Sequence, residues 1–223
     1  MKRFLSLIII ISMFGILAGC GTNKTENNTE KSLETVTATD APTENTTNGS
    51  DAIVVYFSRA GEQYKVGNID TGNTAVVAEM IAKKTGADVF EITPAEDNYP
   101  MDSYDDLIDY AKQEQNDNAR PAIKDDVENF EQYGTVFLGY PIWWGDMPMI
   151  VYTFLENHDF EDKTIIPFCT HEGSGNAGTK SKIENVIPSA IVEDVFAIRG
   201  EEAQKKREDT QNKVNEWLEG YGY

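Results

Sequence analysis

The residues best suited to chemistry lie in three separate stretches of the chain. The first covers residues 58–61 and resumes at 71–74, where a predicted helix begins. Free backbone N–H groups and the helix dipole favour an anion at such a place. The stretch contains neither Gly-Lys-Ser/Thr nor Gly-x-Gly-x-x-Gly, so a nucleoside triphosphate loop and a dinucleotide site are both disfavoured. Hydroxyl and backbone groups without a lysine suit a monophosphate, and a plain turn with a helix cap is the alternative.

The second and third stretches supply aromatic and small polar groups. Residues 139–148 read Gly-Tyr-Pro-Ile-Trp-Trp-Gly-Asp-Met-Pro and directly follow a predicted buried strand. A flat aromatic ligand would give the two tryptophans something to cover, although one of them is expected to pack as core. Gly145 would let the backbone approach a ring closely. Residues 170–176 read Thr-His-Glu-Gly-Ser-Gly-Asn and can offer N–H groups to the polar edge of a ring, with a solvated turn as the alternative.

Apolar patterns predict the elements that position these stretches. Short continuous apolar runs indicate strands buried on both faces, and helical spacing indicates helices. The predicted strands are 53–57, 88–92, 135–140, 164–169 and one within 190–198, and the predicted helices are 73–85, 103–115, 148–157, 180–186 and 201–219. Strict alternation requires crossovers and therefore a parallel sheet. We predict an α/β fold, a three-layer, doubly wound, five-stranded parallel sheet of order 2-1-3-4-5, whose carboxyl edge carries all three stretches.

The first fifty residues differ from the rest. Lys2 and Arg3 precede an apolar run at 4–17 that is too short for a membrane span, and Leu-Ala-Gly-Cys follows at 17–20. This pattern predicts a lipoprotein signal peptide over residues 1–19 and lipidation of Cys20, with an ordinary secretory signal as the alternative. Residues 20–50 would hold the lipidated cysteine and a disordered tether rich in Thr, Asn and Glu. Residues 51–223 have the size of one domain.

Composition argues against several function classes. The formal net charge of −19 makes nucleic acid a poor partner, and contact with a membrane is expected only through the N-terminal lipid. With Cys20 assigned to lipid, Cys169 is left as a buried, inert thiol. There is no disulfide framework and no metal-ligand spacing, and two histidines make a Ser-His-Asp triad a weak proposition.

Taken together, the motifs resemble those of the flavodoxin-like family. They are Tyr-Phe-Ser-Arg-Ala-Gly at 56–61, Gly-Asn-Thr at 72–74, Gly-Tyr-Pro-Ile-Trp-Trp at 139–144 and Thr-His-Glu-Gly-Ser-Gly at 170–175. The pattern is most similar to the branch of flavodoxins and flavodoxin-like lipoproteins of Gram-positive bacteria, and it covers residues 51–223. The resemblance implies FMN as the cofactor. Unlike ordinary flavodoxins, this chain has residues 62–70 inserted between the halves of its phosphate loop, so the loop must bulge outward while Ser58 still meets Asn73 and Thr74.

The resemblance also implies which residues touch the cofactor. The phosphate would lie among Ser58, Arg59, Ala60, Asn73 and Thr74. The isoalloxazine would be lined by Pro141, Ile142, Trp143 and Trp144, with Gly145 beside them. Thr170, His171, Glu172, Gly173 and Ser174 would complete the ring pocket.

Three functions stay open at this point. The first is electron transfer at the outer face of the cytoplasmic membrane of a bacterial cell, with a redox partner protein or a small quinone-like acceptor. The second is an FMN-dependent quinone or nitro-compound reductase that uses NAD(P)H, which is scarce outside the cytoplasm. The third is a cofactor-free binding lipoprotein, because fold does not fix function. His171 is the candidate acid or base, since a histidine at a flavin edge could protonate the flavin or a quinone, and a purely structural role is its alternative.

Overall fold

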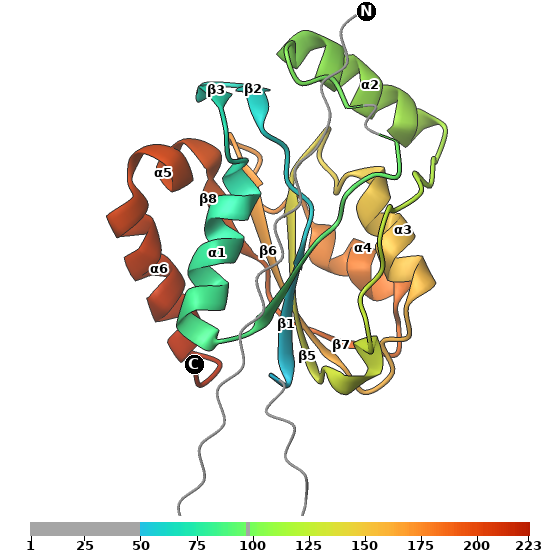
Figure 1. Cartoon of the computed structure of the whole chain (residues 1–223), viewed down its shortest axis with the longest axis vertical. Coiled ribbons are helices and arrows are strands. Elements are labelled where there is room, and N and C mark those ends of the chain that lie inside the picture. Colours follow the sequence, from blue (N-terminus) through green and yellow to red (C-terminus); the bar gives the residue numbers. More distant parts are fainter. Residues whose placement is uncertain (1–49, 97–98) are drawn as a thin grey trace, which may run out of the picture. The chain divides into compact units, whose positions relative to one another are not determined.

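A parallel sheet with helices on both faces is built from residues 50–96 and 99–223, which are the residues that this computed structural model describes (Figure 1). The predicted signal peptide, the lipidation site at Cys20 and the predicted tether up to residue 49 lie outside them. Among the described residues, no helix combines the length and apolar character needed to cross a membrane.

The sheet has the predicted order. β4 (Asp88–Glu91) pairs with β1 (Ala52–Tyr56), β1 with β5 (Thr135–Pro141), and β5 with β6 (Thr164–His171). β7 (Ile191–Val192) and β8 (Phe196–Arg199) both lie beside β6, and every pair in this sheet is parallel. With β7 and β8 counted as one interrupted fifth strand, the order is 2-1-3-4-5, which confirms the doubly wound fold.

Helices cover both faces of the sheet (Figure 1). α1 (Asn73–Thr85), α5 (Gly200–Lys205) and α6 (Arg207–Glu219) lie on one face, and α2 (Tyr104–Asn116), α3 (Met149–Asn157) and α4 (Thr179–Val186) lie on the other. A 3₁₀ turn, η1 (Phe130–Gln132), precedes β5. Successive residues of β1 point to opposite faces, so Val54 joins the core under α1 whereas Val55 joins the core under α3. Each such buried side chain contributes about 1.5–3 kcal/mol to folding.

The fifth strand is interrupted where its neighbour has a proline. The carbonyl oxygens of Lys163 and Ile165 accept hydrogen bonds from Ile191 and Glu193, so the odd-numbered residues of β6 face the fifth strand. The next odd-numbered residue is Pro167, which has no N–H to donate. The ladder resumes only at Phe168, opposite Phe196. The predicted closing helix is also divided, at Lys206, into α5 and α6.

Residues 62–69 of the inserted segment 62–70 fall within a hairpin that the sequence did not predict. β2 (Gly61–Gln63) and β3 (Gly67–Ile69) pair antiparallel. The Glu62 N–H donates to the Met101 carbonyl at 2.9 Å, and the Glu62 side chain accepts from the Tyr104 N–H at 2.8 Å. These bonds fix the hairpin against the start of α2, above the carboxyl edge of the sheet.

Candidate functional site

The first loop and the start of α1 form a compact polar corner. The Ser58 hydroxyl oxygen accepts a hydrogen bond from the Ala75 N–H at 3.0 Å, in the first turn of α1. The Thr74 and Thr170 hydroxyl groups are 2.9 Å apart and buried, which joins α1 to the end of β6. The insertion therefore leaves Ser58 beside the helix start, and the first-turn N–H groups of a helix have no acceptor within it. Such a corner suits an anion.

Arg59 is buried and holds the hairpin. One of its terminal nitrogens donates to the Glu62 carbonyl at 2.6 Å and the other to the Pro100 carbonyl. Burial lowers the pKa of Arg59 from its usual value. The side chain thus ties the loop after β1 to β2 and to the segment before α2, and its buried Nε atom has no hydrogen-bond partner in the chain.

Two small adjoining cavities follow this corner and form one cleft. The first has Ser58, Arg59 and Thr74 in its wall, and the second has Ile142, His171 and Glu172. Residues common to both are Gln63, Asn73, Pro141, Trp143 and Thr170. The cleft lies where β1, β5 and β6 end, which is the place where ligands bind in doubly wound sheets.

The two adjacent tryptophans, Trp143 and Trp144, lie in different environments. Trp143 lines the cleft while its ring packs edge-on against Phe57, with centroids 5.5 Å apart, and against Tyr99 at 5.7 Å. Trp144 is 51% exposed and donates its indole N–H to the Ile108 carbonyl of α2 at 2.7 Å. Trp143 is therefore the residue that is partly core, and Trp144 does not line the cleft. Gly145 accepts from the Lys182 side chain through its carbonyl.

His171 organises the loop after β6. Its Nδ1 atom accepts hydrogen bonds from the Gly173 N–H at 3.0 Å and from the Gly175 N–H at 3.3 Å. A neutral ring therefore carries its proton on Nε2. Burial, together with the charge of Arg199, lowers the pKa of His171, which keeps the ring neutral. The loop N–H groups of residues 173 and 175 serve this ring, and Gly173 and Ser174 are exposed.

Asn73 and Glu172 meet beside the start of α5. Glu172 accepts the Glu201 N–H at 2.7 Å through Oε1. A Cβ atom at Gly200 would lie 2.7 Å from the Asn73 Cγ atom and 3.0 Å from the Glu172 Oε1 atom, so a larger residue there would displace these side chains. Burial raises the pKa of Glu172 above its usual range.

The cleft holds buried polar atoms that bond to nothing in the chain. Among the described residues, four buried side-chain atoms have no hydrogen-bond partner, and three belong to the cleft: Arg59 Nε, Asn73 Oδ1 and Glu172 Oε2. A buried polar atom without a partner costs about 1–3 kcal/mol. One donor and two acceptors at a single edge of the sheet are therefore positioned for a polar ligand.

Sequence reasoning missed three side chains of the cleft. Gln63 and Tyr64 come from the unpredicted hairpin, and Tyr104 comes from the first turn of α2. The Tyr64 and Tyr104 rings stack with centroids 5.7 Å apart. The amide nitrogen of Gln63 donates to the carbonyls of Arg59 and Ala60. No local signal marked these residues, because their approach depends on how the hairpin docks.

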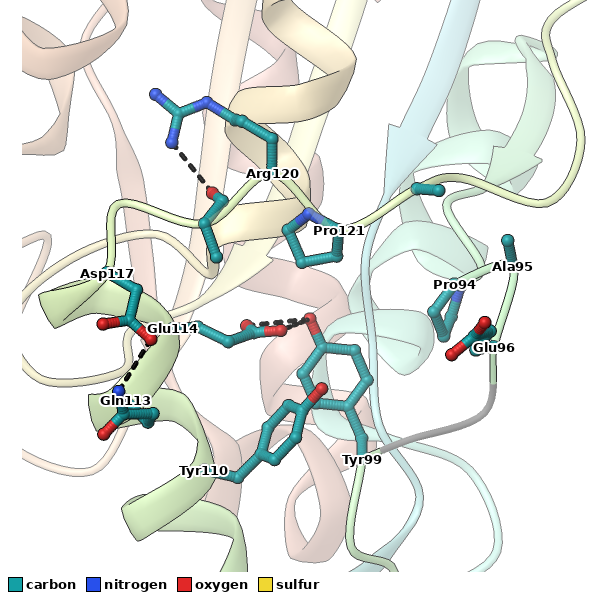
Figure 2. Close-up of a pocket in the computed structure, with 12 residues that line it drawn as sticks. Pro94, Ala95, Glu96, Tyr99, Tyr110, Gln113, Glu114, Asp117, Arg120 and Pro121 are labelled. Atoms are coloured by element: carbon teal, nitrogen blue, oxygen red, sulfur yellow. Dashed lines mark hydrogen bonds between the residues drawn. The ribbon is translucent and has the colours of Figure 1, made fainter.

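A larger cavity, of about 460 Å³, lies between α2 and the segments 94–96 and 119–122 (Figure 2). At its floor the Tyr99 hydroxyl donates to the buried carboxyl group of Glu114 (Figure 2). Its wall residue Arg120 pairs with Glu156 through two bonds of 2.7 Å. None of the unpartnered atoms described above belongs to this cavity. The cleft is therefore the better candidate for a ligand site.

Comparisons with known proteins agree with this geometry. The model of the flavodoxin family matches residues 51–220. The chain belongs to the flavodoxin family. No curated protein matches it. FMN is the cofactor of a flavodoxin-like cleft. The polar corner, the Trp143 ring that lines the cleft and the unpartnered atoms described above fit that molecule.

Solved structures show the same flavodoxin fold. A protein regarded as a flavoprotein from Bacteroides eggerthii is 29% identical, with a TM-score of 0.61, over 77% of this chain and 98% of that one. A similarly described protein from Bacteroides uniformis is 27% identical, with a TM-score of 0.62, over 77% and 99%. A flavoprotein in complex with FMN from Lactobacillus acidophilus is 20% identical, with a TM-score of 0.53, over 70% and 96%.

Proposed function

We propose that this flavodoxin is an FMN-dependent electron carrier, tethered by a lipid on Cys20 to the outer face of the bacterial cytoplasmic membrane. The observation that carries the redox part is the set of three unpartnered buried atoms, Arg59 Nε, Asn73 Oδ1 and Glu172 Oε2, at the carboxyl edge of the sheet. When bound, FMN supplies one-electron and two-electron chemistry, and the chain supplies position and electrostatics.

The polar corner would hold the phosphate. The hydroxyl groups of Ser58 and Thr74 and the first-turn N–H groups of α1 are neutral donors at one point. The uncommitted Arg59 Nε–H adds a donor with positive charge, which forms stronger hydrogen bonds than a neutral one. A phosphate here would meet the Arg59 Nε–H, which the folded chain leaves without an acceptor.

The aromatic wall and the loop after β6 would hold the ring. Pro141, Ile142 and Trp143 present an apolar surface along one side of the cleft. His171 keeps its proton on Nε2 and its Nδ1 committed to the loop, so it acts as a positioning residue for that loop. The proton on Nε2 remains the only one that a neutral His171 could give to a flavin or an acceptor.

A carrier is favoured over a nicotinamide-dependent reductase by charge. The exposed face at the start of α2 carries Asp105, Asp106 and Asp109 close to Tyr104 in the cleft wall. The chain as a whole has a net charge of −19. Acidic groups repel the pyrophosphate of a nicotinamide dinucleotide, whereas they attract a basic redox protein.

The redox proposal is tested with the chain from residue 21 onward. FMN is titrated into the cofactor-free protein while flavin fluorescence is followed, and the complex is then reduced with dithionite and, separately, mixed with NADH in a stopped flow. We expect FMN to bind, dithionite to reduce it, and NADH to do so slowly. Protein that never retains FMN supports the cofactor-free alternative, and rapid reduction by NADH supports the reductase.

The anchor is tested separately with the full-length chain expressed in a bacterium. Support for it comes from the sequence Leu-Ala-Gly-Cys at residues 17–20. We expect the chain in the membrane fraction, with labelled palmitate incorporated, and we expect Cys20→Ser to lose the label. Cys169→Ser is the matched control, because that thiol is buried. Equal labelling of the wild type and Cys20→Ser would contradict the anchor.

A further inference from the structure

A second hollow adjoins the cleft along α2. It measures about 200 Å³ and is lined by Leu107, Ile108 and Ala111 of α2 and by Trp144 of the loop after β5. Tyr104, Ile142 and Trp143 line both this hollow and the cleft. We call it the α2 slot. A molecule in the α2 slot would therefore share three side chains with a ring held in the cleft.

Trp144 forms one wall of the α2 slot at a conformational cost. It has φ of 51° and the following Gly145 has φ of 70°, with Trp143 and Asp146 exchanging two backbone hydrogen bonds around them. Positive φ at both central residues is the geometry of a type I′ turn, which favours Asn or Gly. For a bulky residue this conformation costs about 1–3 kcal/mol. Such strain persists where surrounding contacts fix it and is concentrated at ligand sites.

The contacts that hold Trp144 aim it along α2. Its indole N–H donates to the Ile108 carbonyl at 2.7 Å, and the Lys112 ammonium lies 5.2 Å from the ring centroid. Half of the Trp144 surface nevertheless remains exposed. A large indole is thus fixed as an open wall rather than buried as core.

The lining restricts what can enter. Apart from the hydroxyl of Tyr104 and the indole N–H groups, the side chains that line the α2 slot are apolar. Asp105, Asp106 and Asp109 stand on the same helix and are exposed, while Lys112 already covers the Trp144 ring. This combination favours a flat, uncharged, largely apolar molecule and disfavours an anion such as a nucleotide.

We propose that the α2 slot binds the ring of a quinone as the electron acceptor. The proposal rests on the FMN function proposed above: reduced FMN would give two electrons and two protons to the quinone, yielding quinol and oxidised FMN. The contribution of this chain is to hold the acceptor ring against Trp143 and Ile142, next to the flavin.

The test fills the slot without touching the cleft. Ala111→Leu places an isobutyl group in the α2 slot, and Gln113→Leu adds the same group on an exposed position of the same helix as a control. The probe is menadione. In the FMN-loaded chain from residue 21 onward, we measure the menadione concentration dependence of reoxidation, the rate with ferricyanide, which needs no slot, and the Kd for FMN.

We expect Ala111→Leu to raise the menadione concentration needed for half-maximal reoxidation at least tenfold, while the ferricyanide rate and the FMN Kd stay within twofold. We expect Gln113→Leu to change none of these three quantities. Unchanged menadione kinetics, or equal loss of FMN, would overturn the proposal. Tighter binding of NADH than of menadione to the α2 slot, measured by competition between the two, would also overturn it.

Two further measurements keep the result decisive. Quenching of tryptophan fluorescence by menadione in the cofactor-free protein reports the slot if Ala111→Leu weakens it and Gln113→Leu does not. This readout does not need FMN, so failure of the FMN function and failure of the slot are separate outcomes. If Ala111→Leu unfolds the domain, Ile108→Ala removes wall contacts at a half-buried position and should weaken menadione several-fold. Unchanged quenching with this variant would contradict the proposal.

Discussion

Gly72→Ala is the sharpest test of the polar corner. Gly72 has φ of −61° and ψ of 153°, which any residue adopts, so backbone conformation costs nothing. An added Cβ would collide with the Ser58 hydroxyl oxygen and lie 2.5 Å from the Arg59 carbonyl oxygen. Because contact needs about 3.5 Å, the loop after β1 must withdraw from α1 by about 1 Å.

The magnitude follows from two effects. Overpacking a tight contact costs about 1–3 kcal/mol, and loss of the Ser58–Ala75 hydrogen bond costs about 0.5–1.5 kcal/mol. The sum, about 2–4 kcal/mol, lowers Tm by roughly 5–15 °C for a domain of this size. Loss of one hydrogen bond to the phosphate would also raise the Kd for FMN by about 10–100-fold, since each 1.4 kcal/mol of binding free energy changes Kd tenfold.

Thermal unfolding by circular dichroism and a fluorescence titration with FMN measure both effects. Gly220→Ala is the control, because Gly220 also has negative φ and a Cβ there would approach only the Trp217 carbonyl, at 3.2 Å. Adding Ser58→Ala to Gly72→Ala should recover only part of the loss, because the Arg59 carbonyl remains. A Gly72→Ala variant with unchanged Tm and unchanged FMN affinity would refute the packing argument.

Three further predictions concern buried groups. Thr74→Val leaves the Thr170 hydroxyl without its partner and should lower the free energy of unfolding in urea by about 1–3 kcal/mol; no change would mean that the pair is not formed. Because burial raises the pKa of Glu114 in the folded chain, the folded state holds this proton more tightly, and stability is lost as pH rises from the unfolded value through the folded one. Glu114→Gln should flatten that part of a urea series taken across pH, and an unaltered slope would argue against the assignment. Burial raises the pKa of the Cys169 thiol to about 12, so it should react with a disulfide reagent at pH 8 only after unfolding, and prompt reaction of the native protein would contradict its burial.

The fold could be predicted from sequence because its signals are local. The apolar run of β1 and the helical spacing of α1 each identify one element, and Gly86 ends α1 in the left-handed conformation with its N–H bonded to the Ala82 carbonyl. Ser103 caps α2 by accepting the Asp106 N–H. The hairpin β2–β3 escaped prediction because it has no apolar alternation and is held by tertiary bonds from Arg59 and Tyr104.

The position of the cleft could be predicted from the topology, but the contacts of its side chains could not. Three loops at the carboxyl edge follow from the strand order, which predicts Ser58, Trp143 and His171 at that edge, and all three line the cleft. What each side chain does there depends on packing. Arg59 donates to the nearby Glu62 carbonyl and to the Pro100 carbonyl, and Trp144 donates to the Ile108 carbonyl of α2. Pro100 and Ile108 are distant in sequence, so local patterns do not predict these two contacts.

The unpartnered atoms also weigh against the cofactor-free alternative. Three buried polar atoms that cost about 1–3 kcal/mol each would together take roughly 3–9 kcal/mol from a domain whose net stability is about 5–15 kcal/mol. Water can meet part of that need. A polar ligand that completes the hydrogen bonds of Asn73 and Glu172 would remove the rest of the cost. The cost of leaving these atoms unpaired is then recovered as binding energy, and FMN should raise the stability of the domain by RT ln(1 + c/Kd), where c is the concentration of free FMN.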